Sequence, residues 1–165
     1  ASKTVLASYN ISDPNVGMSN TYNLDNFRLY STDVGLLVTL MFKDKVFTEN
    51  VVYKKILSNK LPTNLGIVYE NAVAQILATK GYQLYYHTYY DEIQKRNYEI
   101  DFIIPKGDKI APIEVKSSGY KSHKSLNWFY DKYRHRISEK IVIHTKDLSY
   151  AESTLYLPIY LTMFL

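Results

Sequence analysis

The order of hydrophobic periods along the chain predicts an α/β fold in which helices flank a mixed sheet. A helical repeat of apolar side chains ends at Gly81, and three segments with strand-like alternation follow it. A second helical repeat over 122–136 separates these strands from a short apolar segment over 141–144. The sequence therefore predicts an α/β sandwich whose last strand joins the sheet through a crossover connection.

The elements after residue 60 have the clearest boundaries. Thr63 or Asn64 can cap the first helix, and Gly81 can end it. The tripeptide at 106–108, Lys-Gly-Asp, predicts the turn of a hairpin between two of the strands. The predicted strands lie over 83–89, 98–104, 110–117 and 141–144, and the apolar segment 155–165 predicts a buried strand or a short helix.

The residues before 60 predict a more irregular arrangement. Thr32 or Asp33 can cap a helix that continues to Met41, because Ser, Thr and Asp side chains accept hydrogen bonds from the first free amides. The other expected elements are an extended run over 4–9, a polar loop over 10–26 that forms a hairpin tip or wing, a strand over 27–30 and a helix over 48–57.

Composition excludes several classes of site. The chain has 165 residues, 46% of them hydrophobic and 22% charged, which is typical of a folded domain. It contains no cysteine, so a disulfide framework, a thiolate zinc site and a cysteine nucleophile are all excluded. The formal net charge is only +4. The segment from Lys106 to Lys146, however, holds ten basic and four acidic residues. This excess predicts either a phosphate-binding surface or an ordinary solvated face.

No segment predicts export or a membrane span. The first nine residues are too short and too polar for a signal peptide, and the apolar C-terminal segment is eleven residues long and contains Pro158. A membrane helix needs about 20 apolar residues. We therefore expect a cytoplasmic protein with no membrane partner.

Three ionisable residues lie on strands that are otherwise apolar. Because side chains alternate along a strand, Glu114 and Lys116 share one face of their strand. If the predicted hairpin pairs the strands over 98–104 and 110–117, Asp101 can lie beside Glu114 and Lys116. Such groups are costly to bury unless they are paired or bind metal. In the predicted strand over 98–104, alternation places four side chains on one face: Tyr98, Ile100, Phe102 and Ile104. It places Glu99, Asp101 and Ile103 on the opposite face.

A fourth carboxylate can join this group. Glu70 lies on or beside the apolar stripe of the first long helix, where a carboxylate is unexpected. Carboxylate oxygens suit Mg²⁺ or Mn²⁺, and such an ion can promote hydroxide formation at a phosphodiester. A nearby lysine can offset charge on the transition state. The cluster therefore predicts metal-assisted phosphodiester hydrolysis, with a structural cross-strand ion pair between Glu114 and Lys116 as the alternative.

Asp101 followed by Glu114-Val115-Lys116, with Glu70 on an earlier helix, resembles the PD-(D/E)XK nuclease superfamily. The proline that often precedes the first aspartate is replaced by Ile100. The resemblance implies a restriction-endonuclease-like mixed sheet flanked by helices. It also implies that Asp101 and Glu114 are metal ligands, that Lys116 is the catalytic lysine and that Glu70 is a supporting acid.

A narrower resemblance covers most of the chain. It is carried by five segments in order: FRLYSTDVGLL, GIVYENAVAQIL, NYEIDFII, APIEVKSS and LPIYL. They resemble the nuclease-like C-terminal domain, of unknown function, of prokaryotic AAA-type ATPases, in which it follows the ATPase module and a winged helix. The chain has no phosphate-binding loop of its own, so ATP is expected only in a preceding ATPase module. The expected division is a winged-helix-like tail with connecting helices over 1–60 and a nuclease-like domain over 61–165.

Further residues are candidates for nucleic-acid contact. Lys121, His123 and Lys124 precede a helix and can bind phosphate at its N-terminus, or form a polar loop capped by Ser122. Four tyrosines can stack on bases or lie in the core: Tyr85, Tyr86, Tyr89 and Tyr90. We expect a Mg²⁺-dependent nuclease-like domain acting on DNA. The alternative is an inactive module of the same fold that binds DNA or protein for the ATPase.

Overall fold

The computed structural model describes residues 4–43, 54 and 65–165. Nearly all of the predicted helix over 48–57, and the capping candidates Thr63 and Asn64, lie outside the described residues. Among the helices that are described, none combines the length and the apolar character that a membrane crossing requires.

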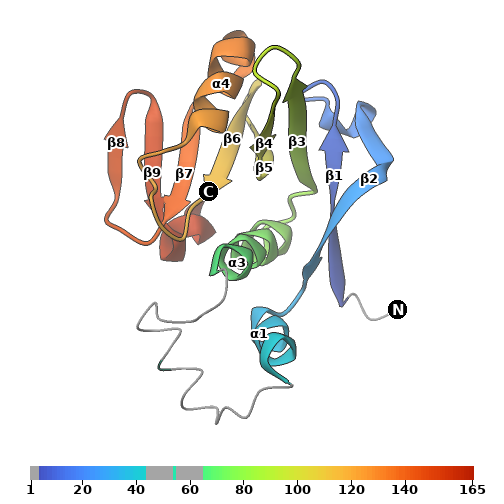
Figure 1. Ribbon diagram of the computed structural model, residues 1–165, viewed down its shortest axis with the longest axis vertical. Coiled ribbons are helices and arrows are strands. Elements are labelled where there is room, and N and C mark those ends of the chain that lie inside the picture. The colour runs from blue at the N-terminus through green and yellow to red at the C-terminus, as the bar shows by residue number, and fades with distance from the viewer. Residues whose placement is uncertain (1–3, 44–53, 55–64) are drawn as a thin grey trace.

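Within the described parts of the chain, nine strands form two mixed sheets (Figure 1). The first has the order β2-β1-β3-β4, with β1 and β3 parallel and the other pairs antiparallel. Its strands are β1 (Val5–Ile11), β2 (Tyr22–Ser31), β3 (Leu84–Asp91) and β4 (Arg96–Ile100). The second has the order β5-β6-β7-β9-β8, in which β6, β7 and β9 are parallel. Its strands are β5 (Phe102–Lys106), β6 (Lys109–Val115), β7 (Lys140–His144), β8 (Ser149–Ala151) and β9 (Thr154–Pro158).

A single residue, Asp101, joins the two sheets. Ile100 at the end of β4 pairs with His87 in β3, whereas Phe102 at the start of β5 pairs with Ile113 in β6. The chain therefore leaves one sheet and enters the other at Asp101, with β3, β4 and β5 at the junction (Figure 1).

This junction corrects the predicted alternation of the strand. Tyr98, Ile100, Phe102 and Ile104 were expected on one face, but Ile100 packs with Ile103 in one core and Phe102 packs with Ile104 in another. Because the strand changes partners at Asp101, the alternation of faces does not continue in step across this residue. Irregularities of this kind re-aim side chains locally.

The helices lie on opposite faces of the second sheet, as the sandwich prediction requires. α3 (Leu65–Thr79) packs on the face formed by Ile141 and Ile143, and α4 (Lys124–Tyr133) packs on the face that includes Val142. The predicted helix over 122–136 comprises α4 and the short turn η2 (Arg134–Arg136). α4 connects the parallel strands β6 and β7, which confirms the predicted crossover.

The predicted turns and helix ends also have a clear physical origin. Asp33 caps α1 (Val34–Phe42), because its side chain accepts a hydrogen bond from the amide of Leu36 at 3.0 Å. Gly81 follows α3 with a φ of +88°, and Gly107 has a φ of +65° in the hairpin between β5 and β6. Both conformations are left-handed and favour glycine.

The N-terminal strands belong to the same sheet as β3. The polar loop predicted over 10–26 is shorter, because β1 continues to Ile11, β2 starts at Tyr22 and only the short turn η1 (Met18–Asn20) lies between them. At the other end, the C-terminal segment forms both β9 and the short helix η3 (Ile159–Phe164). A domain boundary at residue 60 stays a prediction; β1 and β2 share a sheet with β3 and a core with α3.

Asn71 of α3 links this helix to β2 through two hydrogen bonds. It is 2% exposed, its Oδ1 accepts a hydrogen bond from the amide of Ser31 at 2.7 Å, and its Nδ2 donates to the carbonyl of Ser31 at 2.9 Å. We expect Asn71→Ala to lower the free energy of unfolding by about 2–3 kcal/mol, since two backbone groups lose their partner. Urea denaturation measures the change. The exposed Asn97→Ala is the control, and equal stability of the two variants would contradict this role for Asn71.

Candidate active site

Asp101 occupies the junction between the sheets. It is partly buried, and its Oδ2 accepts a hydrogen bond from the amide of Val115 at 2.7 Å. Val115 is the last residue of β6, so the hydrogen bond holds Asp101 beside the segment that carries Glu114 and Lys116. The structure therefore brings together the residues for which the sequence predicted a common surface.

Glu114 and Lys116 form an ion pair at the end of β6. Glu114 is 6% exposed, and its Oε1 lies 2.6 Å from Nζ of Lys116. The other oxygen, Oε2, is buried and has no hydrogen-bond partner among the described residues. A buried carboxylate oxygen with no donor is costly, so this atom is available to a ligand.

Glu70 reaches the site from α3 and is held by residues of β2. The hydroxyl of Tyr30 donates to Oε1 of Glu70 at 2.5 Å, and Nη1 of Arg28 lies 3.7 Å from the same oxygen. Arg28 also forms an ion pair with Glu99. Burial and then the charge of Glu70 raise the pKa of Tyr30, so the hydroxyl keeps the proton that it donates.

Arg28 and Tyr30 are the site residues that sequence reasoning missed. Both lie in a strand that looked like part of a preceding module, forty residues or more from Glu70. The signal available in the sequence was the alternation of Arg28 and Tyr30 with Phe27 and Leu29, which places Arg28 and Tyr30 on one face of the strand. In the structure, Phe27 and Leu29 are exposed on the other face.

The carboxylates of the site act on one another. The pKa of Asp101 is raised to about 8, first by burial and then by the charge of Glu70, with smaller contributions from Glu114 and Glu99; the hydrogen bond from Val115 opposes the rise. Among the described residues, only Arg28 and Lys116 form ion pairs with these acids. The site therefore has more carboxylates than cations, and an added cation would stabilise it.

The donor set suits a hydrated divalent cation. Within the described part of the chain, no group of three or more His, Asp and Glu side chains is arranged to enclose a metal ion. Asp101 and Glu114 nevertheless offer hard oxygen atoms, and one oxygen of Glu114 has no partner. Since Mg²⁺ is often held by one or two carboxylates and keeps several waters, these two residues fit it.

The residues predicted to contact nucleic acid lie in two environments. Lys121 and Lys124 are exposed, whereas His123 is buried, with its Nδ1 3.3 Å from the carbonyl of Tyr120 and its ring against Tyr156. The N-cap of α4 is His123 rather than Ser122, and it makes no side-chain capping hydrogen bond. The interior position of His123 leaves the two lysines as the accessible members of this group.

The tyrosines of β3 are mostly engaged within the protein. Tyr85 and Tyr86 are buried, and the ring of Tyr89 stacks on Trp128 with centroids 4.6 Å apart. Trp128 also stacks on Tyr98 and so anchors α4 on β3 and β4. Of the four candidates for base stacking, Tyr90 has the most exposed ring.

Comparisons with known proteins identify a family but no characterised relative. A family model described as Domain of unknown function (DUF4143) matches residues 65–162. No curated protein and no solved structure matches the chain. The matched span is more than half of the chain and includes Glu70, Asp101, Glu114 and Lys116. The chain therefore belongs to the DUF4143 family, a domain of unknown function.

Proposed function

We propose that this domain has a nuclease-like fold and hydrolyses phosphodiester bonds of DNA with Mg²⁺ or Mn²⁺. The proposal rests on one observation: Asp101 lies beside the Glu114–Lys116 ion pair at the junction of the sheets. Two carboxylates beside one ammonium provide a cation site and a positive group for phosphate.

Each residue has a distinct role in this proposal. Asp101 and Glu114 would hold the metal ion, which would supply hydroxide formation and offset charge on the phosphodiester. To hold a cation, Asp101 would have to lose its proton, because its pKa of about 8 leaves it mostly protonated at neutral pH. Lys116 places its ammonium beside the phosphate. Glu70 is a supporting acid, and Tyr30 and Arg28 fix its position.

The proposed setting is a larger cytoplasmic polypeptide. In that setting an AAA-type ATPase module precedes this domain and binds ATP. The support is the resemblance of the five sequence segments quoted above and the basic excess between Lys106 and Lys146. Arg28 and Tyr30 would connect the upstream part of the chain to the site, since both lie on β2.

A second candidate is an inactive module that binds DNA or protein for the ATPase. It is favoured by the 2.6 Å contact between Lys116 and Glu114, which engages the lysine in an ion pair. Metal binding separates the candidates. If Mn²⁺ at saturating concentration leaves Asp101 and Glu114 unoccupied in a soaked crystal, the second candidate stands.

Nicking of supercoiled plasmid tests the first candidate directly. We expect the chain to nick plasmid in Mg²⁺ or Mn²⁺ and not in EDTA, and Asp101→Ala to slow nicking by about 10²-fold or more, because a metal ligand is lost. Agarose electrophoresis measures the rates. The control is Glu92→Ala, which removes an exposed carboxylate outside the site. Nicking that survives Asp101→Ala would show that the activity comes from a contaminant.

A further inference from the structure

A pocket of about 530 Å³ lies beside the candidate active site. It is formed by the loop 117–122 after β6 and by residues 144–146 at the end of β7. Because β6 and β7 are parallel, with Val115 opposite Ile143, these two segments leave the sheet at the same edge. Lys116 lines the pocket and also pairs with Glu114, so the pocket adjoins the proposed reaction centre at Lys116.

The charge of this pocket is positive. Lys116, Lys121 and Lys146 line it, and none of its described lining residues is acidic. Lys121 and Lys146 are exposed and form no ion pair within the described parts of the chain. Several serines add hydroxyl groups. Two uncompensated ammonium groups with neighbouring hydroxyls match the oxygens of a phosphate group.

Buried His144 fixes both segments of the pocket. The ring of Tyr120, from the first segment, stacks on His144 with centroids 4.4 Å apart. The amide of Lys146, from the second, donates a hydrogen bond to Nδ1 of His144 at 3.0 Å. The imidazole is 2% exposed, and burial lowers its pKa, so Nδ1 stays an acceptor at neutral pH. Lys121 and Lys146 therefore extend from anchored backbone.

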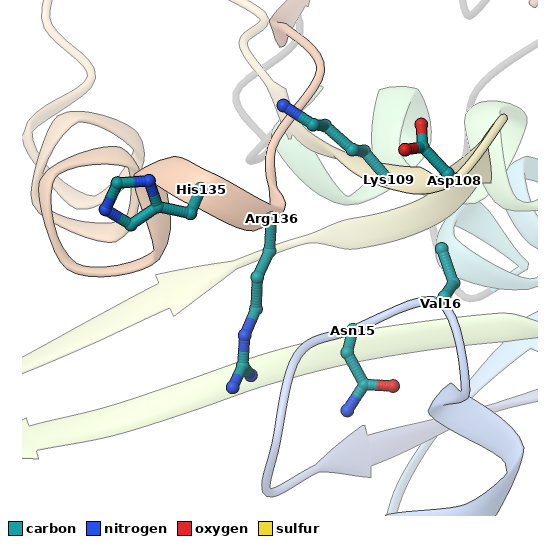
Figure 2. A pocket seen from close by; sticks show the side chains of 6 residues that line it. All are labelled: Asn15, Val16, Asp108, Lys109, His135 and Arg136. Carbon is teal, nitrogen blue, oxygen red and sulfur yellow. The ribbon is translucent and has the colours of Figure 1, made fainter.

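A second pocket with basic residues lacks these properties. It has a volume of about 340 Å³ and includes Lys109, His135 and Arg136, but also Asp108. Figure 2 shows the side chains of Lys109 and Arg136 pointing in opposite directions. Arg136 is already bound to Asp13 and to the carbonyl of Pro14. The positive groups of this second pocket therefore do not converge on one ligand.

We propose that the pocket between Lys121 and Lys146 binds a backbone phosphate of DNA adjacent to the one that reacts beside Lys116. The inference rests on the proposed function for the position of the reacting phosphate. It adds Lys146, which sequence reasoning did not select, and it places Lys121 in a phosphate site formed by two loops. It leaves out His123, which is buried.

Binding without metal tests the pocket separately from catalysis. The probe is a fluorescein-labelled 20-base-pair DNA duplex, titrated in EDTA and followed by fluorescence anisotropy at several salt concentrations. We expect Lys121→Gln and Lys146→Gln each to weaken binding by about 3–10-fold. Each should also lower the slope of log K against log salt by about one, as expected for one lost phosphate contact. Lys109→Gln is the matched control, because Lys109 lies at the opposite end of β6 and should leave both quantities unchanged.

The outcomes separate the two proposals. Unchanged affinity and slope in both pocket variants overturn the phosphate pocket, and so does a failure of the unmodified chain to bind the duplex. Weakened binding in both variants with an unaffected control supports it. If binding depends on Lys121 and Lys146 but plasmid is never nicked in Mg²⁺ or Mn²⁺, the proposed function fails and the phosphate pocket stands.

Discussion

Asp101→Asn is expected to raise the free energy of unfolding at pH 8 in metal-free buffer, although it removes a proposed metal ligand. Burial and neighbouring carboxylates raise the pKa of Asp101 from an ordinary 3.8 to about 8. A carboxyl with a raised pKa contributes its stability below pH 4, and that stability is lost as pH rises from about 4 to 8. An asparagine carries no charge at pH 8, and its carbonyl can still accept the hydrogen bond from Val115.

Urea denaturation at several pH values measures this effect. We expect the variant to exceed the wild type by about 2–4 kcal/mol at pH 8, allowing for the partial exposure of the carboxyl, and the difference to vanish near pH 4. Mg²⁺ should stabilise the wild type at pH 8 and not the variant. The exposed Asp25→Asn is the control and should change neither quantity. A variant less stable than the wild type at pH 8 would contradict the raised pKa.

Lys116→Met is expected to lower the free energy of unfolding by about 3–5 kcal/mol and to abolish nicking. The substitution keeps an unbranched apolar stem of four heavy atoms but leaves the Glu114 carboxylate buried without the ammonium that lies 2.6 Å away. An unpaired buried charge costs far more than the pair itself contributes. Urea denaturation at pH 7 and the plasmid assay measure the two effects.

Two further variants show whether the loss comes from the stranded charge. Adding Glu114→Gln to Lys116→Met should restore part of the stability, since the carboxylate is then gone, but not the nicking. Lys106→Met removes a surface ion pair with Glu139 in which Lys106 is 51% exposed, and should cost less than about 1 kcal/mol. If the Lys106 and Lys116 variants lose equal stability, Glu114 is not held as a buried charge.

Local patterns predicted most of the elements because each depends on neighbouring residues. The cap at Asp33, the end of α3 at Gly81 and the hairpin at Gly107 all follow from the hydrogen bonds and φ values that a few residues can adopt. The Glu114–Lys116 pair was equally predictable, since residues two apart share a face of a strand.

The sheet junction was not predictable in the same way. Alternation in 98–104 continues without a break in the sequence, and it carries no information on which strand pairs with each half. The change of partner at Asp101 depends on where the pairing of β4 with β3 ends and the pairing of β5 with β6 begins, and alternation does not encode that point. The contacts of Arg28 and Tyr30 with Glu70 were missed for a different reason, because they join segments about forty residues apart.

The position of β1 and β2 determines how the chain can be shortened for biochemistry. The family match starts at residue 65, yet β3 pairs with β1, and Glu70 is held by two residues of β2. A chain trimmed to the matched span would expose the edge of β3, and unpaired strand edges promote aggregation. It would also lack Arg28 and Tyr30, so inactivity of such a fragment would reflect a missing part of the site.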